Sequence, residues 1–377
     1  MDTIIHVYHP KRRLLLLEYT THSSQTQSQP PNVLLFIGGL YDNFRSPRYI
    51  DDLAALFPRD GPAQKWRVMH VQMSSAGKQF GLCDLDRDVE EISAAITYIR
   101  EHVTCSPATP VVLMGHSTGC QDVLHYLCSH PPAPRPIIAG GILQAPVSDR
   151  EAIIHDVNRN PSTQSAWKSA MSIISSTPKD KYATTILPLH VSTPLVGPAP
   201  VNITRFLSLT SPDSPENPAM DDYFSSDLTD ARLVDTFGRI GSAGRVQPSN
   251  PSKAAVLIIP SGSDEHVAQS IDKAHLLARW KEAIETPSSS SSGSHPQVQA
   301  YLSPHSQIIR NALHDISGAS ISACTARLID MRAAVLRYLG DVVGDIDESR
   351  TGQGPWAVWE RDRKAIETEA GVAGIKL

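Results

Sequence analysis

The segment VVLMGHSTGCQDVLHYL, residues 111–127, constrains the fold of this 377-residue chain more than any other. Four apolar residues run into Gly115-His116-Ser117-Thr118-Gly119, and an apolar-periodic stretch follows. A Gly-x-Ser-x-Gly sequence between a strand and a helix is typical of a strained turn that exposes a nucleophilic serine. We therefore interpret Ser117 as a nucleophile. The alternative is a serine-glycine turn in an ordinary strand–helix unit.

Short apolar runs alternate with amphipathic segments along most of the chain, which predicts an α/β fold with a mostly parallel sheet flanked by helices. Residues 3–8 and 14–19 predict a hairpin. Further strands are predicted at 33–37, 66–73, 111–114, 137–144 and 254–259, with a last one within 298–309. Helices are predicted at 49–57, 86–102, 120–129, 269–284 and 323–339.

The alternation breaks between residues 149 and 252, a stretch that is rich in proline and has two helical pieces. We interpret 149–252 as an inserted cap over the sheet, and 1–148 with 253–340 as the core. Residues 286–297 contain a run of serines and predict a flexible loop. The tail, 341–377, holds Trp356 and Trp359, and we expect these side chains to pack it onto the core.

A serine hydroxyl becomes a good nucleophile when a base takes its proton, and the base needs an orienting acid. In enzymes with this strand–turn–helix nucleophile, the acid and then the histidine follow the serine along the chain. Asp264 lies in PSGSDEHV, the segment just after the apolar run AAVLII, so it is the predicted acid. Glu265 and Asp149 are alternatives. A purely structural interpretation of Asp264 is that it caps the next helix.

The base should follow the last strand, where two histidines compete. His314 lies in IIRNALHDIS, shortly after two isoleucines that end an apolar run, and we favour it. His305 lies in YLSPHS and is the alternative. His266 and His295 are predicted to be solvated, and His116 to be a packed core histidine.

The negative charge that forms on the substrate oxygen needs hydrogen-bond donors. One predicted donor is the backbone N–H of Thr118, the residue after the nucleophile. The second should come from the loop IGGLYDNF after residues 33–37, where Leu40 or Gly39 is the candidate. The alternative interpretation of this diglycine is a simple tight turn.

Composition excludes several other classes of protein. The net charge of −5 and the pI of about 6.3, without a long basic run, argue against nucleic-acid binding. No apolar run predicts a signal peptide or a membrane span. Five cysteines without a CxxC pattern indicate reduced thiols and a cytoplasmic location. The ending Ile375-Lys376-Leu377 only faintly matches a peroxisomal signal.

No metal motif, phosphate loop or dinucleotide fingerprint is present in the sequence, so no metal and no cofactor is expected. The expected partner is a small-molecule ester, and the expected state is a monomer or homodimer.

The segments LLFIGGLYDNF, VQMSSAGKQFGLCDLDRDVEEI, VVLMGHSTGCQDVLHYL and IIRNALHDISG resemble one branch of the α/β-hydrolases. This branch, found in fungi and plants and long catalogued as a domain of unknown function, includes the fungal siderophore (fusarinine-type) esterases. The resemblance covers about residues 30–340. It implies an α/β-hydrolase fold with Ser117 as nucleophile, Asp264 as acid and His314 as base.

The resemblance also implies a substrate with ester bonds between hydroxamate-bearing units, whose cleavage inside the cell releases iron. Members of the branch often have glycine where Tyr41 stands, so a different loop geometry is expected here. Residues 149–252 should determine the choice of substrate. The alternative functions are a carboxylesterase or thioesterase acting on another small polar ester, and a non-catalytic binding protein with the same fold.

Overall fold

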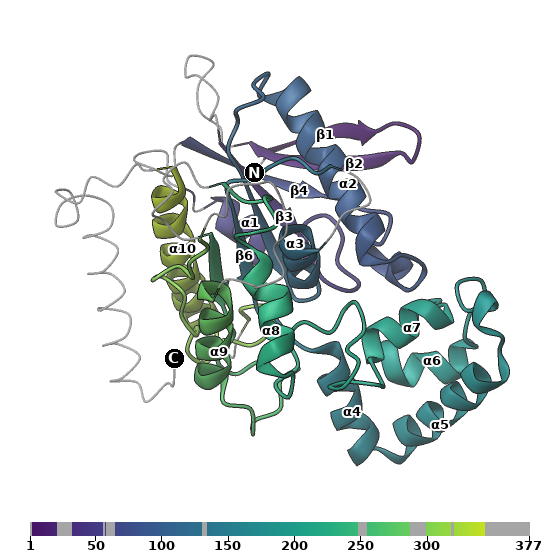
Figure 1. Ribbon diagram of the computed structural model, residues 1–377. Coiled ribbons are helices and arrows are strands. Elements are labelled where there is room, and N and C mark those ends of the chain that lie inside the picture. Colours follow the sequence, from purple (N-terminus) through teal and green to yellow (C-terminus); the bar gives the residue numbers. More distant parts are fainter. Residues whose placement is uncertain are drawn as a thin grey trace.

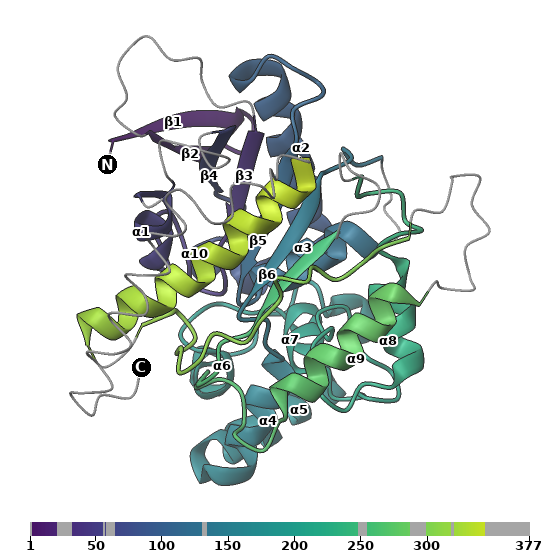
Figure 2. The same ribbon diagram turned by 90° about the vertical axis from the view of Figure 1, so that its left-hand side faces the viewer.

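The computed structural model describes residues 2–20, 32–55, 57, 65–129, 134–247, 255–286, 299–317 and 320–343. Within these ranges seven strands form one sheet in the order β1-β2-β4-β3-β5-β6-β7 (Figures 1 and 2). The strands are β1 (Asp2–His9), β2 (Leu14–Thr20), β3 (Asn32–Ile37), β4 (Trp66–Val71), β5 (Val111–His116), β6 (Gly140–Gln144) and β7 (Val256–Ile259). The hairpin pairs β1 with β2, β2 is antiparallel to β4, and all the other pairs are parallel. The predicted mostly parallel sheet is confirmed.

Helices cover both faces of this sheet, which explains the continuous apolar runs of its central strands. Val33, Leu35 and Ile37 of β3 pack on one face, and Leu34 and Phe36 pack on the other. The first face is covered by α2 (Leu85–Tyr98), α3 (Gly119–Cys128), α8 (Asp230–Thr236) and α9 (Lys273–Glu285). The second is covered by α1 (Tyr49–Ala55) and α10 (Ile321–Val343), which runs across the sheet in Figure 2.

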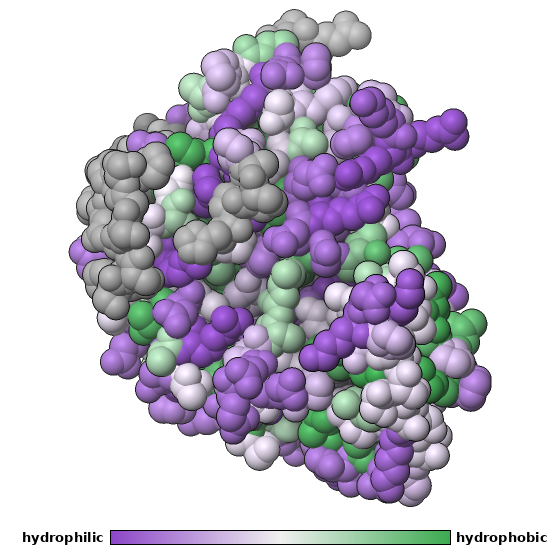
Figure 3. All heavy atoms as spheres, turned by 45° about the vertical axis from the view of Figure 1, so that its right-hand side comes forward, coloured by the Kyte–Doolittle hydropathy of each residue, from purple (hydrophilic) through white to green (hydrophobic). Residues whose placement is uncertain are grey.

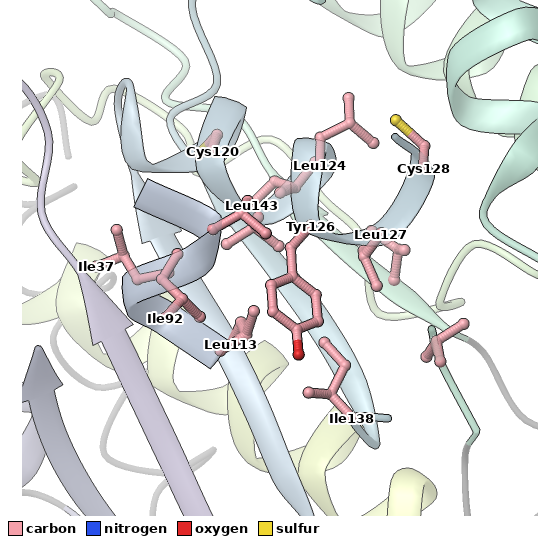
Figure 4. Close-up of a cluster of buried hydrophobic side chains, with 14 of the residues drawn as sticks. Ile37, Ile92, Leu113, Cys120, Leu124, Tyr126, Leu127, Cys128, Ile138 and Leu143 are labelled. Carbon is pink, nitrogen blue, oxygen red and sulfur yellow. The ribbon is translucent and has the colours of Figure 1, made fainter. Parts of the chain in front are cut away.

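Helix α3 brings the Gly-x-Ser-x-Gly segment into the core. Its side chains Leu124, Tyr126 and Leu127 lie among Leu113 of β5 and Leu143 of β6 (Figure 4). Every residue of α3 is buried. Packing along the whole length of α3 therefore holds the start of the helix in place, and with it the turn that carries Ser117.

The predicted strand within 298–309 is wrong for residues 299–309, the part that the structure describes. This segment forms only isolated bridges, from Leu302 to Val256 and from Ile309 to Ser261. Pro304 lies between the two bridges and has no N–H to donate to a ladder, so the backbone of this segment forms no continuous ladder with β7.

The predicted insertion, 149–252, divides into two parts by its packing (Figure 1). We call the first part, residues 149–210, the cap. It contains α4 (Asp149–Arg159), α5 (Pro161–Ser176), α6 (Leu189–Val196) and α7 (Ile203–Thr210), which share an apolar cluster of their own around Ala170 and Phe206. In the second part, Phe224 and Phe237 pack against Trp280 of α9 and belong to the cluster of the sheet.

Large hydrophobic side chains are exposed on and beside the cap, among them Ile186, Leu189 and Met220. Figure 3 shows hydrophobic residues gathered at the lower right of the molecule, whereas hydrophilic residues predominate at the upper right. None of the helices in the described ranges combines the length and hydropathy that crossing a membrane requires. Residues 287–297, with His295, and the tail beyond Val343, with Trp356 and Trp359, lie outside the described residues.

Candidate active site

Ser117 lies on a sharp turn between β5 and α3, with a backbone φ of 55°. A Cβ atom on Gly115 would lie 2.1 Å from the carbonyl oxygen of Gly119, and one on Gly119 would lie 2.5 Å from that of Ile37. Any larger residue at either position would therefore push the helix away from the strands. This turn is the strained geometry expected of a nucleophilic serine.

His314 and Asp264 come together from two loops beyond the carboxyl end of the sheet. The Nδ1–H of His314 donates to Oδ2 of Asp264 across 2.8 Å, and both side chains are buried. The loops are joined by backbone bonds from Gly262 to Ile309 and from Ser263 to Ala312. A carboxylate on Nδ1 keeps the Nε2 atom of the imidazole available to accept a proton.

The alternative acids and the alternative base have other partners. Glu265 accepts the backbone N–H of His314 across 2.9 Å, and Asp149 accepts the side-chain amide of Gln121 across 2.8 Å. Nε2 of His305 lies 3.1 Å from Oδ2 of Asp341 in α10. Among the candidate bases and acids named from the sequence, it is the side chains of His314 and Asp264 that form a hydrogen bond with each other.

Two further histidines flank His314. His116 is buried, as expected, with Nδ1 2.5 Å from Oε1 of Gln144, and its ring centroid lies 4.9 Å from that of His314. Burial lowers the pKa of His116 to about 4, so this ring is neutral near pH 7. His266 is exposed, as expected, yet its ring meets that of His314 nearly edge-on at 4.7 Å. Its contact with the candidate base was not predicted.

The loop after β3 approaches the nucleophile closely. A Cβ atom on Gly39 would lie 2.7 Å from Cβ of Ser117 and 3.2 Å from its Oγ. The N–H of Gly39 donates to Oδ2 of Asp42 across 2.7 Å, so it already has an acceptor. Among the described residues, no acceptor pairs with the N–H of Leu40 or Thr118. Leu40 and Thr118 are thus the better placed of the three predicted donors.

Asp42 organises this loop, a role that sequence reasoning missed. Besides the N–H of Gly39, its carboxylate accepts the hydroxyl of Ser46, and its carbonyl accepts the N–H of Gly77 across 2.8 Å. The only sequence signal was an Asp three residues after a diglycine, which is common in ordinary turns.

Tyr41 connects the same loop to the cap. Its backbone has a φ of 68°, a conformation that favours glycine. Its hydroxyl donates to the carbonyl of Val196 at the end of α6 across 2.9 Å, and its ring packs edge-on against Phe80. Tyr41 therefore keeps a backbone conformation that a glycine would adopt, and its side chain adds a contact with the cap. The expected change in loop geometry stays a prediction.

A cavity of about 550 Å³ lies over Ser117 and His314, between the core loops and the cap. Leu195, Val196 and Leu209 of the cap region form an apolar wall, and Asp149 lines it as well. Within the described ranges, no group of three or more histidine, cysteine, aspartate or glutamate side chains is placed to hold a metal ion. Ser117 and His314 at the cavity are side chains that suit acyl transfer from an ester.

Comparison with known proteins gives three main similarities. The chain is 37% identical over 340 residues to "Fusarinine C esterase sidJ" of Aspergillus fumigatus, covering 82% of this chain and 89% of that protein. It is 34% identical over 366 residues to "Esterase AN6793" of Emericella nidulans, covering 88% and 91%. The solved structure titled "Siderophore hydrolase EstB from Aspergillus fumigatus" matches with a TM-score of 0.74 and 35% identity, covering 91% of this chain and 98% of that one.

The family model described as "Protein of unknown function (DUF1749)" matches residues 1–337. That match covers most of the chain, and the relatives above are named as esterases or a hydrolase, two of them for siderophores. The predicted resemblance is confirmed: the protein has an α/β-hydrolase fold and belongs to the DUF1749 family, alongside fungal siderophore esterases.

Proposed function

We propose that the protein is a serine esterase in which Ser117 is the nucleophile, His314 the base and Asp264 the acid. The observation that carries this proposal is the hydrogen bond from Asp264 to His314, a histidine that lines the same cavity as Ser117. His314 Nε2 takes the proton of the Ser117 hydroxyl as Oγ attacks the ester carbonyl, and returns it to the leaving alcohol. Water then repeats the sequence and releases the acid from the acyl-enzyme.

The backbone N–H groups of Leu40 and Thr118 are the proposed donors to the oxyanion. A positively charged His314 forms in each half-reaction, and Asp264 stabilises it. The neutral ring of His116 adds no repulsion on its side of His314. A non-catalytic binding role is disfavoured. Ser117 lies on a strained turn, and His314 and Asp264 are hydrogen-bonded to each other, as catalysis requires.

The proposed substrate is a hydroxamate siderophore of the fusarinine type, either fusarinine C or its acetylated form, cleaved at its ester bonds. The names of two relatives support this choice. Cleavage of the ferric complex in the cytoplasm would release iron for use in the cell. A carboxylesterase or thioesterase acting on another small polar ester is the second candidate.

Labelling with a fluorophosphonate probe and siderophore cleavage followed by mass spectrometry test the proposal together. The wild type should be labelled and should cleave ferric or iron-free fusarinine-type siderophore to monomers, whereas Ser117→Ala should do neither. Equal labelling of both proteins would refute Ser117 as the nucleophile. Hydrolysis of short nitrophenyl esters without siderophore cleavage would support the esterase activity and reject a siderophore as the substrate.

A further inference from the structure

Asp149 is an acidic side chain in the cavity that the proposed triad does not use. It is the first residue of α4, immediately after Ser148, whose hydroxyl caps the helix by accepting the N–H of Glu151. Oδ2 of Asp149 is fixed by the amide of Gln121, one helical turn beyond Ser117. The carboxyl group is thereby held at a defined position in the same cavity as the nucleophile.

Asp149 is flanked in the cavity wall by apolar side chains of its own segment. Val147, Ala152 and Ile153 line the cavity from the same stretch of chain. Leu195 and Leu209 line it from the opposite part of the cap region. In binding sites of this kind, a few placed polar groups in an apolar wall select the ligand.

Arg205 and Arg150 are paired with other carboxylates. Arg205 binds Asp221, with one of its nitrogens 2.5 Å from Oδ1, and Arg150 binds Asp227 across 2.6 Å. In the part of the chain that the structure describes, no lysine or arginine forms an ion pair with Asp149. Arg48 also lines the cavity, but as an exposed side chain.

The energetics of the site agree with a missing positive charge. Burial raises the pKa of Asp149 to about 7, and the nearby Asp221 raises it further, against the opposing effects of Arg205 and His314. A cation placed beside the carboxyl group would favour its ionised form and reverse this shift. A partly buried carboxylate that lines a cavity can bind an ammonium group through a charge-assisted hydrogen bond.

We propose that Asp149 forms an ammonium subsite, so that the enzyme prefers esters carrying a protonated primary amine over the same esters with the amine acylated. This inference rests on the proposed esterase function and narrows its substrate class. Acylation removes the charge, and it leaves an amide that offers one N–H in place of three.

The test compares methyl esters of β-alanine and 6-aminohexanoic acid with those of their N-acetyl derivatives, at about pH 7.5, where these amines are protonated. Two chain lengths place the ammonium at two distances from the ester. For the wild type we expect kcat/KM at one length to favour the amine by about 10- to 100-fold. In Asp149→Asn the ratio of the two kcat/KM values should fall to about one.

Glu151→Gln is the matched control. Glu151 lies in the first turn of the same helix and loses the same charge, but it binds Ser226 and does not line the cavity. We expect its amine preference to equal that of the wild type. A preference that survives in Asp149→Asn, or that falls equally in Glu151→Gln, would overturn the inference.

A binding measurement separates this inference from the proposed function. Calorimetry with Ser117→Ala should detect the amine esters, and the additional Asp149→Asn change should weaken their binding by about tenfold or more. If the wild type cleaves no ester yet this loss of binding occurs, the esterase proposal fails and the subsite stands. If the wild type cleaves esters but Ser117→Ala binds the amine esters equally well with and without Asp149→Asn, the subsite is rejected and the esterase proposal stands.

Discussion

Nδ1 of His314 lies 2.8 Å from Oδ2 of Asp264, although the two residues are 50 positions apart in the chain. The adjacent carboxylate, Glu265, binds the same histidine through its backbone N–H instead of its ring. Two neighbouring acids thus hold one histidine in different ways, and substitutions should separate their contributions.

Asp264→Asn should lower kcat on a short nitrophenyl ester by about 10⁴-fold, because the amide can favour the wrong tautomer of His314. Glu265→Gln is the matched control, since its side-chain oxygen can still accept the backbone N–H of His314. We expect its kcat to stay within about tenfold of the wild type. Equal losses in the two variants would reject Asp264 as the orienting acid. Steady-state kinetics gives both values.

Asp42→Ala should lower kcat by up to about 100-fold with little change in KM, because the loop that carries the Leu40 N–H loses its internal acceptor. Ser46→Ala removes one of the two contacts of this carboxylate and should have a smaller effect. A rise in KM without a fall in kcat would show that the loop positions the substrate and not the oxyanion donor.

Arg205→Met should destabilise the protein by about 3–5 kcal/mol, since it leaves Asp221 buried without its partner. Arg205 also donates to the carbonyl of Phe80, so the change weakens the contact between α7 and the core. Urea denaturation measures the free energy of unfolding. The double variant Arg205→Met/Asp221→Leu should recover part of the loss, and an equal or larger loss would contradict the prediction.

The contribution of Asp88 to stability should fall as the pH rises from about 4 to about 7. Burial raises the pKa of Asp88 to about 7, with Glu91 and Asp221 adding to the shift and Ser75 and Arg205 opposing it. Above about pH 4 the unfolded chain releases this proton while the folded protein retains it, so ionisation opposes folding until the folded-state pKa is passed. Above about pH 7 the cost is constant.

Asp88→Asn removes this titration. Its free energy of unfolding, relative to the wild type, should therefore increase between about pH 4.5 and pH 8. Denaturation curves at a series of pH values measure the difference. A difference that does not change with pH would show that Asp88 does not contribute to this dependence.

Much of the core was predictable because its signals are local. The apolar run of β3 and the amphipathic pattern of α2 reflect burial that each segment undergoes in any α/β fold. Ser117 was predictable for the same reason, since its turn is defined by two glycines within two residues of it. Even so, α2 ends at Tyr98 and a π-helical turn, Ile99–Val103, completes the predicted segment.

What sequence reasoning missed depends on contacts between distant segments. Asp42 looks like a turn residue until Gly39 is seen against Ser117. The division of residues 149–252 follows from Phe224 and Phe237 meeting Trp280, a contact that no local pattern encodes. The place of Asp149 in the cavity likewise depends on Gln121 of α3.

The bond from Tyr41 to Val196 has a consequence for the ester-binding cavity. The loop that approaches Ser117 and the helix that forms the apolar wall cannot shift independently while this bond is intact. Filling of the wall by a ligand and the placement of the Leu40 N–H are therefore thermodynamically linked, and linkage is reciprocal. We therefore expect an ester whose apolar part fills the space along this wall to have a higher kcat as well as a higher affinity.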